Sequence, residues 1–184
     1  MNLPNYITLF RIVLVPFFFG FLTYYNDQHP NFRFLAFLTF LVAIATDALD
    51  GSIARSFRKQ TELGTFLDPF ADKLLLLSGF LGIAFSSAFI IKPPLWVVIM
   101  VVFRDLFIIC GLVIIFLTTS HIQIRPNLLG KLTTLFQMLT VLAVLAGWKY
   151  SEPIWLATSA FTALSAAAYL VRGIRLINGP LAQT

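Results

Sequence analysis

Charged residues are scarce in this chain of 184 residues. Only 11% are Asp, Glu, Lys or Arg, whereas 59% are hydrophobic, and the mean hydropathy is +0.88. Because a water-soluble domain carries about 25% charged residues, this composition excludes an ordinary soluble domain and predicts a membrane protein. The 13 Lys and Arg residues lie scattered among long apolar runs. The net charge of +5 therefore does not indicate nucleic-acid binding.

Cysteine and histidine are scarce as well. Cys110 is the only cysteine, which excludes an internal disulfide framework and a cysteine-rich metal site. Histidine is present only at His29 and His121, and this argues against a zinc site. Any metal site in this chain is expected to use oxygen ligands.

Long apolar segments take up nearly all of the sequence. A bilayer core about 30 Å thick needs about 20 apolar residues for each helical crossing. We expect six spans, at Ile7–Tyr25, Arg33–Arg55, Leu67–Ile91, Leu95–Thr118, Leu128–Tyr150 and Pro153–Ile177. They leave no room for a second soluble domain, so residues 1–184 are predicted to form one all-α integral membrane domain with six transmembrane helices.

The distribution of positive charge predicts the orientation of these spans. With six spans both termini lie on one side, and that side receives ten of the Lys and Arg residues. The opposite side receives three, Arg33, Lys92 and Lys149. Because positively charged residues concentrate on the cytoplasmic side, the N- and C-termini are predicted to be cytoplasmic.

Half of the acidic residues bracket one connection on that cytoplasmic side. Asp47 and Asp50 are three residues apart near the end of the second span, and Asp68 and Asp72 are four apart at the start of the third. Each pair therefore shares a helix face. Because a short connection joins the two helices, the four carboxylates are predicted to converge.

Such a cluster is unfavourable in an apolar span unless something neutralises it. A carboxylate there costs about 2.5 to 3.5 kcal/mol on insertion scales, and four together repel one another. Hard divalent cations such as Mg²⁺, Mn²⁺ or Ca²⁺ prefer several oxygen ligands. The small residues Gly51, Ala54 and Gly64 allow a ligand close to the backbone, and Arg55 can hold a phosphate oxygen. The pattern indicates a pocket for a pyrophosphate and a flat group.

The spacing of these residues resembles the signature of the CDP-alcohol phosphatidyltransferase family at every defined position. The stretch reads Asp47-x-x-Asp50-Gly51-x-x-Ala54-Arg55, then eight residues, then Gly64-x-x-x-Asp68-x-x-x-Asp72. The resemblance implies a six-span membrane enzyme, two divalent cations (Mg²⁺ or Mn²⁺), and a homodimer. It also implies CDP-diacylglycerol as the donor of the phosphatidyl group.

The resemblance assigns roles to these residues. Asp47, Asp50 and Asp68 resemble ligands of a first metal, and Asp47, Asp68 and Asp72 surround a second. Asp72 is similar to the general base that takes a proton from the acceptor hydroxyl. The residues that resemble the CDP-binding set are Asn5, Asp47, Gly51, Ala54, Arg55 and Gly64.

Two further segments resemble phosphatidylglycerophosphate synthases and the related cardiolipin synthases. One is the N-terminal stretch from Asn2 to Arg11, in which Asn5 and Thr8 alternatively only cap the first helix. The other opens the fifth span, where Lys131, Thr134 and Gln137 recur every three residues and share a face. This face is predicted to line a polar pocket, although a lysine at a span end also commonly snorkels to the interface.

Several cations set within spans bear on the acceptor. We expect Arg104, Lys131, Arg172 and Arg175 to bind the phosphate of an acceptor such as glycerol 3-phosphate. Alternatively, Arg104 is neutralised by Asp105 or a carbonyl, and Arg172 and Arg175 only bind anionic head groups. Choline or ethanolamine would need carboxylates or an aromatic cage. The pair Arg104-Asp105 departs from the Arg-Glu pair of many phosphatidylglycerophosphate synthases and is closer to cardiolipin synthases, whose acceptor is phosphatidylglycerol. Both acceptors stay open at this point.

A divalent-metal transporter and a structural membrane protein are the alternatives to an enzyme. A divalent-metal transporter also places acidic residues in spans, but near the midplane and often in inverted repeats, whereas here the four lie at one edge and no repeat is visible. A structural membrane protein has no need for the cluster. The prediction is thus a phospholipid-synthesising transferase in a membrane. A bacterial inner membrane is favoured, with the active site on its cytoplasmic side.

Overall fold

The computed structural model describes residues 3–57, 62–119 and 128–177, and these form six α-helices and no β-strand. Side chains are described for residues 6–47, 70–111, 113, 128–169 and 171. The helices are α1 (Leu3–Tyr24), α2 (Asn31–Phe57), α3 (Glu62–Phe85), α4 (Leu95–Thr119), α5 (Leu128–Ala146) and α6 (Glu152–Ile177). The all-helical fold with six helices is confirmed.

The helix bounds differ clearly from the predicted segments at the third and the fifth. The third segment was expected at Leu67–Ile91, but α3 covers Glu62–Phe85. Lys92 Nζ donates to Ala84 O and Ser86 O and satisfies carbonyls at the end of this helix, although the apolar run continues.

The fifth segment was expected to continue to Tyr150, but α5 ends at Ala146. Gly147 follows with a φ of 73°, a left-handed conformation that glycine adopts without steric cost. The N–H of Gly147 donates to Val144 O and that of Trp148 to Ala143 O, which satisfies the last carbonyls of the helix. The apolar run thus extends beyond the helix, and Gly147 ends it.

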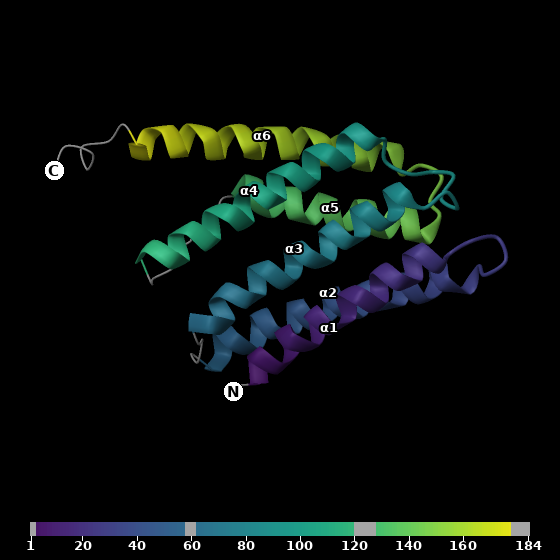
Figure 1. The fold of residues 1–184 in the computed structure, drawn as a ribbon, viewed down its shortest axis with the longest axis horizontal. Helices are drawn as coiled ribbons and strands as arrows, with labels where there is room; N and C mark the ends of the chain where they lie inside the picture. Colours follow the sequence, from purple (N-terminus) through teal and green to yellow (C-terminus); the bar gives the residue numbers. More distant parts are fainter. Residues whose placement is uncertain (1–2, 58–61, 120–127, 178–184) are drawn as a thin grey trace.

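Successive helices run in opposite directions, so α1 and α3 begin at the end of the bundle where α2 ends (Figure 1). α1 packs against α2 and α3, while α6 packs against α4 and α5. α3 also contacts α4 and α5 and lies between the two groups (Figure 1). The aspartates of the predicted cluster belong to α2 and α3, at the end of the bundle where α1 also begins.

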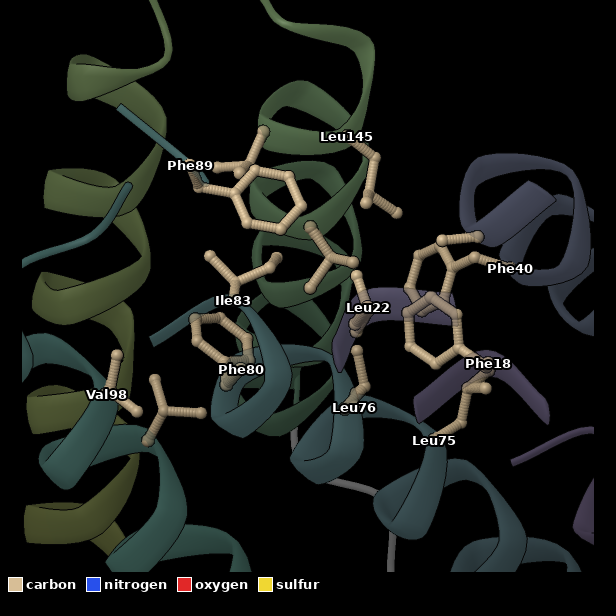
Figure 2. Packing of buried hydrophobic residues seen from close by; sticks show 14 of the residues in the cluster. Phe18, Leu22, Phe40, Leu75, Leu76, Phe80, Ile83, Phe89, Val98 and Leu145 are labelled. Atoms are coloured by element: carbon tan, nitrogen blue, oxygen red, sulfur yellow. The ribbon is translucent and has the colours of Figure 1, made fainter. Parts of the chain in front are cut away.

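A hydrophobic core joins all six helices. Figure 2 shows the rings of Phe18 (α1) and Phe40 (α2) facing each other, and their centroids are 5.2 Å apart. Phe80 and Ile83 of α3 lie in the same cluster, and both are almost fully buried. Close approach of α1 and α3 depends on Gly82, since a Cβ at this position would lie 2.6 Å from Leu22 Cδ1.

The distribution of polarity is unusual for a protein in water. Many large apolar side chains are exposed, among them Phe17, Phe34 and Phe107 at 58%, 65% and 74%. At the same time charged side chains such as Arg11 and Asp105 are fully buried. Soluble monomers rarely expose large contiguous apolar patches. Within the described residues, two helical segments are long and apolar enough to cross a membrane, Tyr6–Tyr24 and Leu128–Ala146.

Candidate active site

Arg11 joins two of the predicted site aspartates at the meeting point of three helices. Its Nη1 lies 2.9 Å from Asp47 Oδ1 and donates a hydrogen bond to Asp72 Oδ1 at 2.6 Å. The arginine comes from α1, Asp47 from α2 and Asp72 from α3. The Arg11 side chain is 1% exposed, whereas those of Asp47 and Asp72 are 37% and 25% exposed. The carboxylates are thus accessible from outside the bundle and the arginine is not.

The apolar stripes of the three helices bring these residues together. On α1, Arg11 lies seven residues before Phe18, on the same helix face. On α3, Asp72 lies four residues before Leu76, which is fully buried. Asp47 lies seven residues after Phe40 on α2. Burial of the stripes therefore fixes the register at which the charged residues meet.

The two carboxylates have a geometry that suits a shared cation. Both Oδ1 atoms contact the same guanidinium nitrogen, so a single positive centre already lies between two side chains from different helices. Carboxylate oxygens are the ligands that Mg²⁺ and Mn²⁺ prefer, and both side chains can be reached from outside. Among the side chains that the structure describes, no group of three or more metal-ligating residues is found. Asp50 and Asp68, the other two predicted ligands, lie outside the described side chains.

A second buried polar cluster lies directly beside the first and is centred on Asp105 of α4. Asp105 Oδ1 accepts hydrogen bonds from Lys73 Nζ at 3.0 Å and from Arg104 Nη1 at 2.6 Å. Its Oδ2 accepts one from Gln137 Nε2 at 3.2 Å. The carboxylate is fully buried, and it pairs with two buried cations and accepts from an amide of a third helix. Lys73 follows Asp72 directly in the sequence, so the two clusters share α3.

Arg104 reaches further across the bundle. Its Nη2 donates to Ser165 Oγ of α6 at 2.9 Å, and its guanidinium lies 6.0 Å from the centre of the Tyr169 ring. Its Nε is buried without a hydrogen-bond partner in the described part of the chain. The neutralisation by Asp105, which was one of the two readings of Arg104 from the sequence, is therefore present. The Nε–H group of Arg104 nevertheless stays available as a donor.

The polar stripe at the start of α5 is divided between two environments. Gln137 and Thr134 join the Asp105 cluster, Thr134 by accepting from Lys73 Nζ at 3.3 Å. Lys131, one turn earlier, is exposed. The shared face predicted from the sequence thus points inward at its second and third residues, while its lysine is exposed.

The remaining predicted site residues fall outside the described side chains. They are Asn5, Asp50, Gly51, Ala54, Arg55, Gly64, Asp68, Arg172 and Arg175. Their roles stay predictions. Conversely, neither Arg11 nor Lys73 was predicted to belong to either cluster. The available signal was the presence of a cation within an apolar span, since such a residue needs a buried partner.

The sequence of this chain is similar to those of known proteins. The chain matches the family model for CDP-alcohol phosphatidyltransferases over residues 1–171. This chain belongs to the CDP-alcohol phosphatidyltransferase family. The resemblance seen in the spacing of the aspartates is confirmed, and so is the enzyme class, a phosphatidyltransferase of phospholipid biosynthesis that uses a CDP-linked donor.

Curated relatives of this chain carry three different names. A probable phosphatidylglycerophosphate synthase of Mycobacterium tuberculosis is 31% identical over 97% of this chain and 84% of its own length. A CDP-diacylglycerol–glycerol-3-phosphate 3-phosphatidyltransferase of Bacillus subtilis is 35% identical over 78% of this chain and 76% of its own length. A probable cardiolipin synthase (CMP-forming) of Drosophila melanogaster is 32% identical over 93% of this chain and 57% of its own length.

Proposed function

We propose that this phosphatidyltransferase moves the phosphatidyl group of CDP-diacylglycerol to glycerol 3-phosphate, giving phosphatidylglycerophosphate and CMP. Relatives from several bacteria are named for this reaction. The structural observation that carries the proposal is the convergence of Asp47 and Asp72 on one cationic centre at the meeting point of α1, α2 and α3. A divalent-metal transporter finds no support, because the family is one of transferases.

The proposed active site holds two divalent cations, Mg²⁺ or Mn²⁺, on Asp47, Asp50, Asp68 and Asp72. When bound, such ions neutralise the charge that develops on the phosphoryl oxygens and orient the groups that react. The donor set is made only of carboxylates, which suits these hard ions. The described pair, Asp47 and Asp72, supports this proposal because its oxygens already share one cation.

In the proposed reaction the protein supplies a base and the positions of the two substrates. Asp72 accepts the proton of the acceptor hydroxyl, and its partial exposure makes it accessible for that role. The acceptor oxygen then bonds to the phosphorus that carries the diacylglycerol. The bond between this phosphorus and the oxygen that bridges it to the phosphate of CMP breaks. CMP leaves with that oxygen and its electron pair. The residues proposed to hold the CDP group are Asn5, Asp47, Gly51, Ala54, Arg55 and Gly64.

The proposed acceptor pocket uses Arg104, Lys131, Arg172 and Arg175. Its described part supports a phosphate-bearing acceptor. Two buried cations, Lys73 and Arg104, face one carboxylate, Asp105, so the cluster keeps a net charge of +1. The buried Nε of Arg104 still lacks an acceptor within the described residues. An anionic group fits such an environment better than a cationic head group.

We place the enzyme in a bacterial inner membrane as a homodimer, with six spans, cytoplasmic termini and its active site on the cytoplasmic side. The exposed apolar side chains and the buried polar network support a lipid environment. The excess of Lys and Arg on the side of the termini supports the orientation.

Release of CMP from purified protein tests the proposal. With CDP-diacylglycerol, Mn²⁺ and glycerol 3-phosphate we expect CMP release, and Asp72→Asn should lower the rate at least about a hundredfold, the usual contribution of a general base. Glu152→Gln changes an exposed carboxylate at the start of α6 and should keep the full rate. An Asp72→Asn protein with the wild-type rate would contradict the role of Asp72.

A panel of acceptors distinguishes the two open substrates. Phosphatidylglycerol is the competing acceptor, and the similarity to a protein named cardiolipin synthase favours its inclusion. We expect the highest kcat/KM with glycerol 3-phosphate. Faster release of CMP with phosphatidylglycerol would instead assign the enzyme to cardiolipin synthesis. No release with either acceptor would refute the proposed activity.

A further inference from the structure

Arg11 occupies the position between Asp47 and Asp72 that the proposed function gives to a divalent cation. Its Nη1 contacts both Oδ1 atoms, at 2.9 Å and 2.6 Å. Each oxygen is therefore already bound to a positive centre from a third helix. A divalent cation that uses both oxygens as ligands has to replace this nitrogen, because two centres of positive charge at one position repel each other strongly.

The charges of this trio leave the site favourable for a dication. One guanidinium faces two carboxylates, so the trio has a net charge of −1, and a second positive charge improves its neutralisation. The two aspartates are partly exposed, which gives an ion access from outside the bundle. The trio therefore carries an uncompensated negative charge and can be reached from outside the bundle.

The arginine itself is only partly satisfied. Its side chain is 1% exposed, yet Nε and Nη2 are buried without a hydrogen-bond acceptor in the described part of the chain. Buried donors without partners are costly, and a buried ion pair contributes little net stability unless its other donors are satisfied. A purely structural arginine at this position would be expected to use its full fork of donors. Arg11 thus joins three helices through Nη1, while its other donors have no acceptor in the described part of the chain.

We propose that Arg11 is a positioning residue that holds Asp47 and Asp72 together when the metal is absent, and that a divalent cation displaces it from these carboxylates on binding. α1 thereby pairs with α2 and α3 through Arg11 in the metal-free protein, and the metal takes over the link between α2 and α3. This inference rests on the proposed metal site and concerns a residue that the sequence assigned to neither metal nor substrate.

Binding of Mn²⁺ alone to the purified full chain tests this inference. Metal-free protein in detergent is titrated with Mn²⁺, and free Mn²⁺ is measured by electron paramagnetic resonance. We expect Arg11→Gln to bind Mn²⁺ about tenfold more tightly than the wild type, because the ion no longer competes with charge-assisted hydrogen bonds. Arg11→Lys keeps a charge without the guanidinium fork, and its affinity should lie between the two.

Thermal unfolding provides a second readout. Arg11→Gln should unfold at a lower temperature than the wild type in EDTA, and the gain in Tm on adding Mn²⁺ should be larger for the variant. Arg33 serves as the matched control because it also joins helices, donating from Nε and Nη2 to Leu145 O and Val144 O at the far end of α5. Arg33→Gln should lower Tm equally in EDTA and in Mn²⁺ and leave Mn²⁺ affinity unchanged.

Each outcome supports or overturns either the role of Arg11 or the metal site. Unchanged or weaker Mn²⁺ binding by Arg11→Gln, with normal binding by the wild type, overturns the inference and leaves the proposed metal site intact. No Mn²⁺ binding by the wild type instead refutes the metal site itself. An Arg11→Gln protein that folds only with Mn²⁺ supports the exchange, whereas one that fails to fold in either condition shows a structural role that the metal cannot replace.

Discussion

Asp105 shows how one carboxylate organises the interior of this phosphatidyltransferase. It accepts hydrogen bonds from Lys73 of α3, Arg104 of α4 and Gln137 of α5, and it is fully buried. Without it, Lys73 and Arg104 would lose the carboxylate to which both of them donate. The residue therefore maintains both the charge balance of the cluster and the contact among three helices.

Replacing Asp105 by Asn should destabilise the enzyme strongly. Loss of one partner from a buried ion pair costs about 3 to 5 kcal/mol, which corresponds to a fall in Tm of about 10 °C for a chain of this size. Asp27→Asn, at an exposed position between α1 and α2, is the control and should leave Tm unchanged. Thermal unfolding in detergent measures both, and equal Tm values for the two variants would contradict the role of Asp105.

At the scale of the helices, α1 packs closely against α3, which carries Asp72, the partner of Arg11. Gly82 permits this contact, since a Cβ there would lie 2.6 Å from Leu22 Cδ1 and 3.0 Å from Leu22 Cβ. Leu22 is fully buried in the core and has little room to move. Small residues at helix interfaces allow such close packing in membranes. Arg11 and Asp72 lie on the same two helices, Arg11 eleven residues before Leu22 and Asp72 ten residues before Gly82.

Gly82→Ala should therefore destabilise the bundle although alanine favours helices. Overpacking costs about 1 to 3 kcal/mol, which exceeds the gain of about 1 kcal/mol from helix propensity. Gly20→Ala on α1 is the matched control, because a Cβ at that position meets no atom within 4 Å. Tm should fall for Gly82→Ala and stay equal or rise for Gly20→Ala. The opposite order would contradict the close contact.

At the scale of the whole molecule, polarity is reversed relative to a soluble protein. Apolar side chains such as Phe34 and Phe107 lie on the outside, whereas Arg11, Asp105 and Gln137 are buried within the bundle. In lipid this arrangement is favourable, because apolar surfaces contact acyl chains and polar groups satisfy one another inside. The fold thereby holds buried charged groups within a structure whose surface suits lipid.

Labelling of single cysteines checks the proposed topology. In a Cys110→Ala background, Gln28→Cys and Lys149→Cys lie at exposed positions between α1 and α2 and between α5 and α6. Both should react with an impermeant maleimide in intact bacterial cells, whereas Gln183→Cys should react only after the cells are opened. The reverse pattern would invert the topology. Different results at positions 28 and 149 would contradict an even number of crossings between them.

Much of the fold could be predicted from the sequence because helices in an apolar chain depend on local features. Runs of about 20 apolar residues separated by turn residues indicated six helices, and the spacing of Asp47 and Asp72 within one motif indicated the family. The end of α5 was placed too late, because hydropathy does not register the left-handed conformation of Gly147. The family match confirms the resemblance that the motif indicated.

The sequence by itself determined the class of the molecule, since composition, helix-length apolar runs and motif spacing are properties of neighbouring residues along the chain. Only the tertiary structure decided the partners of the buried charges. Arg11 and Asp72 are 61 residues apart, as are Arg104 and Ser165. Both contacts depend on which face each helix buries. The contact of Arg11 with Asp72 also depends on how closely α1 approaches α3, where Leu22 packs against Gly82.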